Sequence, residues 1–187
     1  SMVIATPFNK KKHFYYNQKI NLLSAEGGFK FGEVEHKFNN GFGVLDWGRG
    51  VWTYKNTWYW SSLSGNCLGH NIGFNLGYGF GDTSAASENM LFVDDKYFKL
   101  DDVKFNIPQN SKGKDLFMEE WSFTSSSGDI NLTFKPLFDR ASNTNALIIQ
   151  SDQHQVFGVF NGTFKVDDQI YEIKDLIGFA EKVMNRW

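Results

Sequence analysis

The sequence predicts an all-β protein, an antiparallel barrel of about 8 to 12 short strands with one C-terminal helix. Two observations predict this fold class, and a third predicts the number of domains. Apolar and polar residues alternate over most of the chain, which is the period of a strand. Gly, Asp, Asn and Ser interrupt these runs at short intervals, as turn residues do. The 187 residues suffice for one hydrophobic core, so residues 1–187 are expected to form a single domain.

The strands are expected to pair as hairpins in chain order. Turn residues at 32–33, 94–96, 125–129 and 167–168 each separate two alternating runs. Strands are therefore predicted at 13–23, 29–31, 34–38, 57–63, 72–80, 91–93, 97–100, 121–124, 130–134, 146–150, 157–159 leading into 162–166, and 170–173.

The last segment, 175–187, is the one place where the apolar period fits a helix. Asp175 is a suitable N-cap, and charged residues lie between the apolar positions. The apolar positions recur at helical spacing and are Leu176, Ile177, Phe179, Ala180, Val183 and Met184. We expect this helix to lay its apolar side on the sheet.

The predicted strand at 72–81 has two contrasting faces. One face carries large apolar side chains, and the other carries four glycines and Asn75. Glycine weakens a strand, so this face needs a reason: a ligand that approaches closely, another element packed on bare backbone, or a sharp bend. Trp58 and Trp60 share a face of the preceding strand and are either core residues or a platform for a bound ring.

Asp46 and Arg49 lie among apolar residues and are the first charged candidates. A buried unpaired carboxylate is costly, so we expect Arg49 to pair with Asp46. The pair is either structural or the polar anchor of a cavity.

Three further candidates flank predicted strands. His70 and Asp82 stand at opposite ends of the glycine-rich strand, and Asp152 and His154 share a face if extended. Each is either a solvated polar residue or part of a site.

Composition excludes several classes of function. The net charge is −2, and the one basic run, Lys10-Lys11-Lys12, is local, so no nucleic-acid partner is expected. The four histidines are scattered and one cysteine, Cys67, is present, so neither a metal site nor a disulfide is predicted. No phosphate-binding or nucleophile motif indicates a cofactor. No apolar run is long enough for a membrane span, no signal peptide is visible, and a cytoplasmic location is expected.

Several motifs resemble one family, domain of unknown function 2804. They are Phe42-Gly-Val-Leu-Asp-Trp-Gly-Arg-Gly-Val-Trp52, Asn56-Thr-Trp-Tyr-Trp60, Gly73-Phe-Asn-Leu-Gly-Tyr-Gly-Phe-Gly-Asp82, Glu88-Asn-Met90 and the segment 175–187. The resemblance implies the C-terminal half of a longer protein, with Ser1-Met2 as a cloning remnant. The family is more distantly similar to lipocalin-like proteins of the carotenoid hydratase and tocopherol cyclase kind, which implies a lipocalin-like (calycin) barrel.

These inferences lead to three hypotheses for function. The first is a site in the barrel cavity for a small apolar or aromatic molecule, lined by Asp46, Arg49, Trp58, Trp60, His70, Asn75, Asp82 and His154. The second is a cofactor-free hydratase, isomerase or cyclase for a bulky, terpenoid-like substrate, with Asp46 or His70 as the acid. The third is a structural half that docks a missing N-terminal domain or a second copy of the chain.

Overall fold

The computed structural model describes residues 1–187 and contains twelve strands and no helix. Every strand pair is antiparallel, so the predicted all-β antiparallel class is confirmed. The strands are β1 (Met2–Pro7), β2 (Phe14–Phe31), β3 (Val34–Val51), β4 (Lys55–Cys67), β5 (His70–Tyr78), β6 (Met90–Val93), β7 (Lys96–Lys99), β8 (Val103–Asn106), β9 (Trp121–Ser125), β10 (Ile130–Ala146), β11 (Ile149–Val166) and β12 (Gln169–Arg186).

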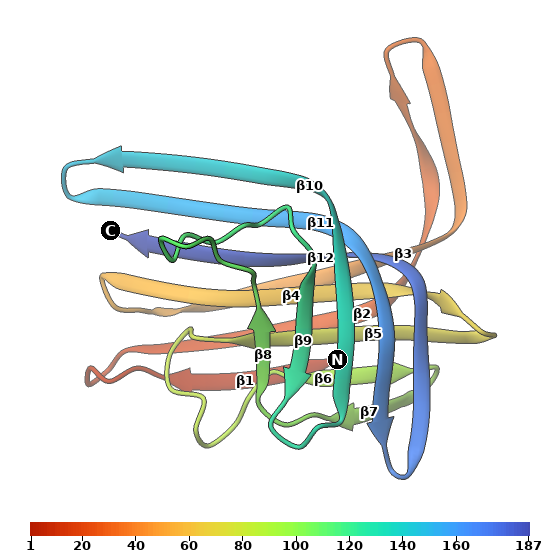
Figure 1. Cartoon of the computed structure of the whole chain (residues 1–187), viewed down its shortest axis with the longest axis horizontal. Helices are drawn as coiled ribbons and strands as arrows, with labels where there is room; N and C mark the ends of the chain where they lie inside the picture. Colours follow the sequence, from red (N-terminus) through yellow and green to blue (C-terminus); the bar gives the residue numbers. More distant parts are fainter.

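Nine of the strands form one sheet that curls into a half-barrel (Figure 1). The hydrogen-bonded order is β7-β6-β5-β4-β12-β11-β10-β9-β8, and the first and last strands do not pair. The curl brings β5 close to β8, although five strands lie between them in the sheet. The Tyr78 hydroxyl accepts a hydrogen bond from the backbone N–H of Phe105 at 3.3 Å, and the two rings lie 5.4 Å apart.

The inside of the curled sheet is filled by side chains. Phe74 of β5 packs on Phe160 and Phe164 of β11, with ring centroids 5.2 and 5.7 Å apart. Phe123 and Phe134 close the cluster, and all five rings are fully buried. A cavity inside the barrel was the expectation, and this interior is instead a close-packed aromatic core.

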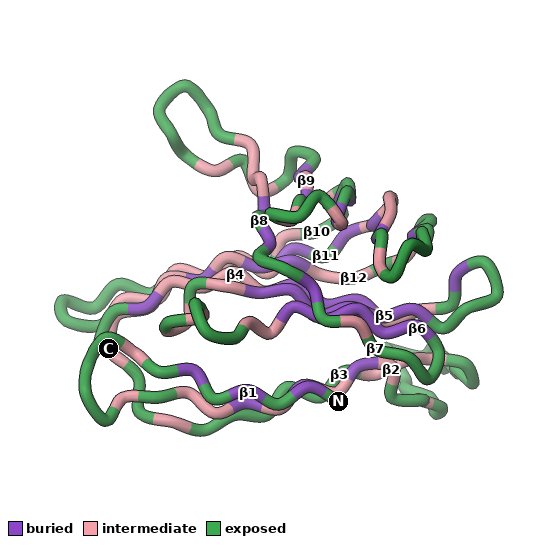
Figure 2. The backbone as a smooth tube through the Cα atoms, turned by 90° about the horizontal axis from the view of Figure 1, so that it is seen from below, coloured by how far each residue is buried: buried purple, intermediate pink, exposed green.

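The remaining strands form a second sheet, β1-β2-β3, that packs on the other face of the nine-stranded sheet (Figure 2). Met2 and Ile4 of β1 pack on Met90 and Phe92 of β6. Asn21 of β2 bridges the two layers, because its buried amide donates to the Ser62 hydroxyl at 2.8 Å and the Phe74 carbonyl at 3.0 Å. The core therefore has an apolar part inside the curl and a more polar part between the two sheets.

The two faces of β5 follow this division. Its apolar face, with Phe74 and Leu76, points into the aromatic core. Its glycine face points to the three-stranded sheet, where a Cβ on Gly73 would lie 3.1 Å from the side chain of Leu22. Close approach of another element is the reason for the glycine at this position.

The predicted C-terminal helix is wrong. Residues 169–186 form β12, which pairs with β11 on one side and β4 on the other. A central strand covered on both faces carries apolar residues on both faces, and adjacent apolar pairs such as Phe179-Ala180 and Val183-Met184 then imitate a helical stripe. Asp175, the expected N-cap, has a φ of +53° at a bulge in the β11–β12 register.

The hairpin turns at 32–33 and 167–168 are confirmed, since Phe31 pairs with Val34 and Val166 with Gln169. The turn predicted at 94–96 is one residue shorter, because Lys96 begins β7 and pairs with Val93. The strand expected at 146–150 is wrong, because residues 147–148 form the turn between β10 and β11. The ends of β2 and β3 project from the sheets as a two-stranded arm (Figure 1). No helix could span a membrane.

Candidate functional site

A chamber of about 220 Å³ lies between the two sheets and combines aromatic rings with buried charges. The strands β2 and β3 contribute residues from one side, β4 and β12 from the other, and the loop 79–89 closes one end. Its lining consists of Tyr15, Lys19, Asp46, Trp52, Trp58, Trp60, Phe80, Glu88 and Glu181.

Lys19 is the cation of the chamber and is almost fully buried. It faces Asp46 directly in the β2–β3 register, and its Nζ lies 3.3 Å from Asp46 Oδ2 and 3.4 Å from Glu88 Oε2. The same Nζ lies 3.7 Å from the centre of the Trp60 ring. An ammonium is stable away from water only with such partners, and here two carboxylates and the face of an indole supply them.

Glu181 is the carboxyl group of the chamber that lacks an ion-pair partner. Its Oε1 accepts a hydrogen bond from Trp58 Nε1 at 2.8 Å, and its Oε2 accepts one from Gln155 Nε2 at 3.1 Å. Both donors are neutral. Burial is the main cause that raises the pKa of Glu181 above its ordinary value, because it disfavours the charged form.

A hydrogen-bonded chain fixes the opposite wall. Trp60 Nε1 donates to Asn75 Oδ1 at 2.7 Å, and Asn75 Nδ2 donates to the backbone oxygen and to Oε2 of Glu88 at 2.9 and 3.1 Å. Asn75 has no exposed surface. Gly77 makes room for this arrangement, because a Cβ there would lie 2.5 Å from Glu88 Oε1.

Phe80 is the centre of the aromatic lining. Its ring lies 4.9 Å from Tyr15, 5.3 Å from Trp58 and 5.9 Å from Trp52, measured between centroids. Most of these contacts are edge-to-face, the geometry that the ring quadrupoles favour. Burial and the nearby charge of Asp46 raise the pKa of Tyr15 to about 12, so its phenol stays protonated.

Strand register explains how distant segments meet here. Glu181 of β12 faces Trp60 of β4, and Trp60 faces Gly77 of β5, so one row across the sheet carries three parts of the chamber. On β2, alternation places Tyr15 and Lys19 on the same face, toward that row.

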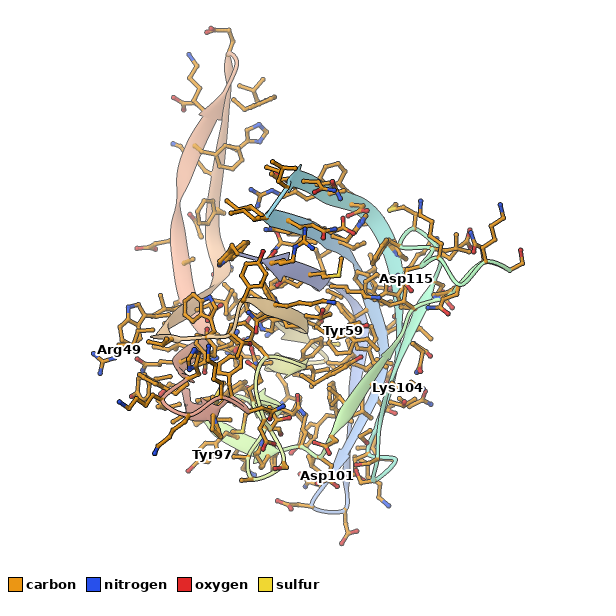
Figure 3. All side chains as sticks on the ribbon, turned by 90° about the vertical axis from the view of Figure 1, so that its left-hand side faces the viewer. Arg49, Tyr59, Tyr97, Asp101, Lys104 and Asp115 are labelled. Atoms are coloured by element: carbon orange, nitrogen blue, oxygen red, sulfur yellow. The ribbon has the colours of Figure 1, made fainter.

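Four predicted site residues meet at this chamber: Asp46, Trp58 and Trp60 line it, and Asn75 supports it. The expected pair of Asp46 with Arg49 is wrong. Residues three apart on a strand point to opposite faces, so Asp46 meets Lys19 while Arg49 lies on the outside (Figure 3). The Arg49 guanidinium stacks near the Tyr16 and Trp47 rings, 5.7 and 5.9 Å from their centres.

The other three predicted residues lie elsewhere. Asp82 is exposed, and hydrogen bonds from the side chain and from the backbone N–H of Ser84 lower its pKa. His70 pairs with Asp94 at 2.7 Å, about half exposed, at the rim of a wide surface depression of about 780 Å³. We place the candidate site in the smaller chamber, because Lys19 and Glu181, the two charged residues that are buried as whole residues, both line it.

His154 belongs to a second polar cluster on the opposite face of the nine-stranded sheet. Its Nδ1 lies 2.7 Å from Asp139 Oδ2, its Nε2 lies 3.8 Å from Asp152 Oδ1, and Phe117 stacks on its ring with centroids 3.7 Å apart. The neighbouring Lys182 pairs with Asp115 and so holds the loop 107–120 over the sheet (Figure 3). These contacts explain the cluster as an anchor for that loop.

Sequence reasoning missed six lining residues, namely Tyr15, Lys19, Trp52, Phe80, Glu88 and Glu181. Lys19 had a signal: Tyr15, Asn17, Lys19 and Asn21 give one face of β2 an uninterrupted polar character, although it points inward. Glu181 had none, because the segment around it fits a helix. The structure holds no group of three or more His, Cys, Asp or Glu side chains arranged for a metal ion.

Comparison with known families identifies the family of this chain. The family described as Domain of unknown function (DUF2804) matches residues 1–187, so the protein belongs to that family. No curated protein gave a significant match.

A solved structure similar to this fold is kievitone hydratase from Nectria haematococca, with a TM-score of 0.47 and 11% sequence identity. The match covers 93% of this chain and 53% of that chain, so this protein spans about half the length of its neighbour. At this identity and TM-score the likeness assigns neither a substrate nor a reaction here.

Proposed function

We propose that the chamber between the two sheets binds a small aromatic or apolar molecule. The observation that carries this proposal is the lining itself: five aromatic side chains surround about 220 Å³ and a few buried polar groups. Such a combination of apolar walls and few polar anchors is typical of ligand sites. We retain the binding function expected from the sequence, but we propose that the site lies between the two sheets and not in the barrel interior.

The chamber restricts the size and shape of the ligand. Its volume is below the ~300–1,000 Å³ of drug-sized sites, so one or two rings fit and a long chain does not. The indole N–H groups of Trp58 and Trp60 already have acceptors, so both rings can serve as apolar walls.

Fluorescence titration with 2-naphthol tests the proposal, because a ring beside Trp58 alters the emission of the tryptophans. We expect saturable binding that weakens about tenfold or more in Trp58→Ala, since stacking and burial of one ring contribute at least ~1.4 kcal/mol. The matched control is Trp47→Ala, because Trp47 is exposed and outside the chamber. Binding without saturation, or equal weakening in both variants, would refute the proposal.

A second candidate function is acid catalysis, and Glu181 is the residue that favours it. A buried carboxyl with a raised pKa retains a proton at higher pH than an ordinary carboxyl, as a general acid requires. In a hydratase, its O–H bond would break to protonate one carbon of a C=C bond. Water would then bond to the other carbon and return a proton to the carboxylate. Glu181 therefore replaces Asp46 and His70 as the proposed acid, because Lys19 pairs with Asp46 and His70 lies outside the chamber.

Partners and location belong to the same proposal. A further domain or a second copy of the chain could dock on exposed apolar side chains of the nine-stranded sheet, including Leu137, Phe138 and Ile177. Phe74 is fully buried and takes no part in such a face.

Cys67 is a buried free thiol, and we retain the proposed cytoplasmic location.

A further inference from the structure

The chamber carries more negative than positive charge. Three carboxyl groups, Asp46, Glu88 and Glu181, line it together with one ammonium group, that of Lys19. Lys19 is shared between Asp46 and Glu88. The sum is −1 with Glu181 protonated and −2 with Glu181 ionised, so the chamber is negative in either state.

Glu181 is the carboxyl group of the chamber with which Lys19 forms no ion pair. Its side chain is buried, and its two oxygens accept hydrogen bonds from an indole and an amide, neither of which is charged. A ligand that fills the chamber removes the remaining water and makes a lone carboxylate still less favourable. A neutral ligand leaves that cost in place, an anion adds to it, and a cation cancels it.

The aromatic lining favours the same sign of charge. Ring faces carry negative potential and attract ammonium groups within ~6 Å. The chamber already shows this recognition once, since Lys19 Nζ lies over the Trp60 ring and between two carboxylates. Trp52, Trp58, Phe80 and Tyr15 provide further ring surface near Glu181, with Trp58 bonded to its carboxylate.

We therefore infer, on the basis of the proposed binding function, that the ligand carries a positive charge: an aromatic or compact apolar molecule bearing a protonated amine or quaternary ammonium group. Its cationic end lies against Glu181 and the ring of Trp58. Its apolar part fills the space around Phe80.

Two isosteric probes separate charge from shape. Phenyltrimethylammonium and tert-butylbenzene have the same size, and differ by a cationic nitrogen in place of a carbon. We expect wild-type protein to bind the cation about tenfold or more tightly than the hydrocarbon, measured by fluorescence titration. In Glu181→Gln, which keeps an acceptor for Trp58, this preference should fall at least severalfold. Asp152→Asn, on the opposite face of the sheet, is the control and should keep it.

The outcomes distinguish this inference from the proposal beneath it. Equal or tighter binding of tert-butylbenzene overturns the inference and leaves an aromatic-binding site. Undiminished preference in Glu181→Gln, with a thermal unfolding curve like that of wild type, also overturns it. If neither probe binds saturably, the inference is overturned. If 2-naphthol also fails to bind saturably in the same assay, the binding proposal is overturned as well.

Discussion

Replacement of Lys19 by Met tests whether the ion-pair centre of the chamber is needed for stability. Met keeps much of the apolar stem of Lys and removes the ammonium, so Asp46 and Glu88 lose the cation that lies 3.3 and 3.4 Å from them. Removing one partner of a buried ion pair costs about 3–5 kcal/mol. The Asp46 and Glu88 side chains are 33% and 17% exposed, so water compensates in part and we expect about 2–3 kcal/mol.

Urea unfolding followed by tryptophan fluorescence measures this loss. For a slope of about 2–3 kcal/mol per M, the midpoint should fall by about 1 M in Lys19→Met. The matched control is Lys174→Met, an exposed lysine without an ion pair, which should stay within about 0.5 kcal/mol of wild type.

A double variant shows whether charge is the cause. In Lys19→Met/Glu88→Gln one of the two uncompensated carboxylates is gone, so the double variant should be more stable than Lys19→Met alone. Two results would refute the reasoning: a loss below about 0.5 kcal/mol in Lys19→Met, or a double variant no more stable than the single one.

Three further predictions concern backbone, core and pH. Gly79→Ala should lower the free energy of unfolding by more than about 2 kcal/mol, because Gly79 has a φ of +96° and a Cβ would lie 2.7 Å from a backbone oxygen. The control Gly69→Ala, with a φ of +86° and open space around the Cβ, should lower it by about 1 kcal/mol. Equal losses for the two variants in urea unfolding would contradict this prediction. Phe160→Ala should lower the free energy of unfolding by about 3–5 kcal/mol, because the ring of Phe160 is fully buried. Phe157→Ala should lower it clearly less, because Phe157 lies on the same strand but is partly exposed. The ranking of the two thermal midpoints checks this prediction. Burial raises the pKa of Glu181 in the folded state, so the wild type should lose stability relative to Glu181→Gln as the pH rises from below the ordinary carboxyl pKa to above the raised one. Urea midpoints that keep the same difference across a pH series would contradict the buried-acid assignment.

The hairpins and the fold class were predictable because their signals are local. The turn at Asp167-Asp168, for example, has both residues at positive φ, as a tight hairpin requires, and Asp tolerates that conformation. The segment 175–187 was not predictable in the same way. Its apolar pattern suits a helix and a doubly covered strand equally, and pairing with β4, more than a hundred residues earlier, decides between them.

The candidate site was predictable in its aromatic part and not in its charges. Trp58 and Trp60 could be identified as candidates from the sequence, because both are large and lie on the same face of one strand. Asp46 was found, but its partner was sought nearby in the sequence, whereas the partner Lys19 lies on the adjacent strand directly across from it. Burial of Glu181 depends on which face of β12 the three-stranded sheet covers, and no local pattern carries that information.

The two faces of the nine-stranded sheet explain why a polar chamber can exist in so small a protein. Glu181 and Lys182 are neighbours in sequence, yet alternation sends one toward β2 and the other toward the loop 107–120. The face inside the curl packs densely with phenylalanine, and these side chains are buried by strands of the nine-stranded sheet itself. The other face carries glycine and Asn75 instead, and β2 meets it with Asn17, Lys19 and Asn21. The polar groups therefore gather where two layers meet, which is also where a ligand that binds between them would couple its affinity to the docking of the sheets.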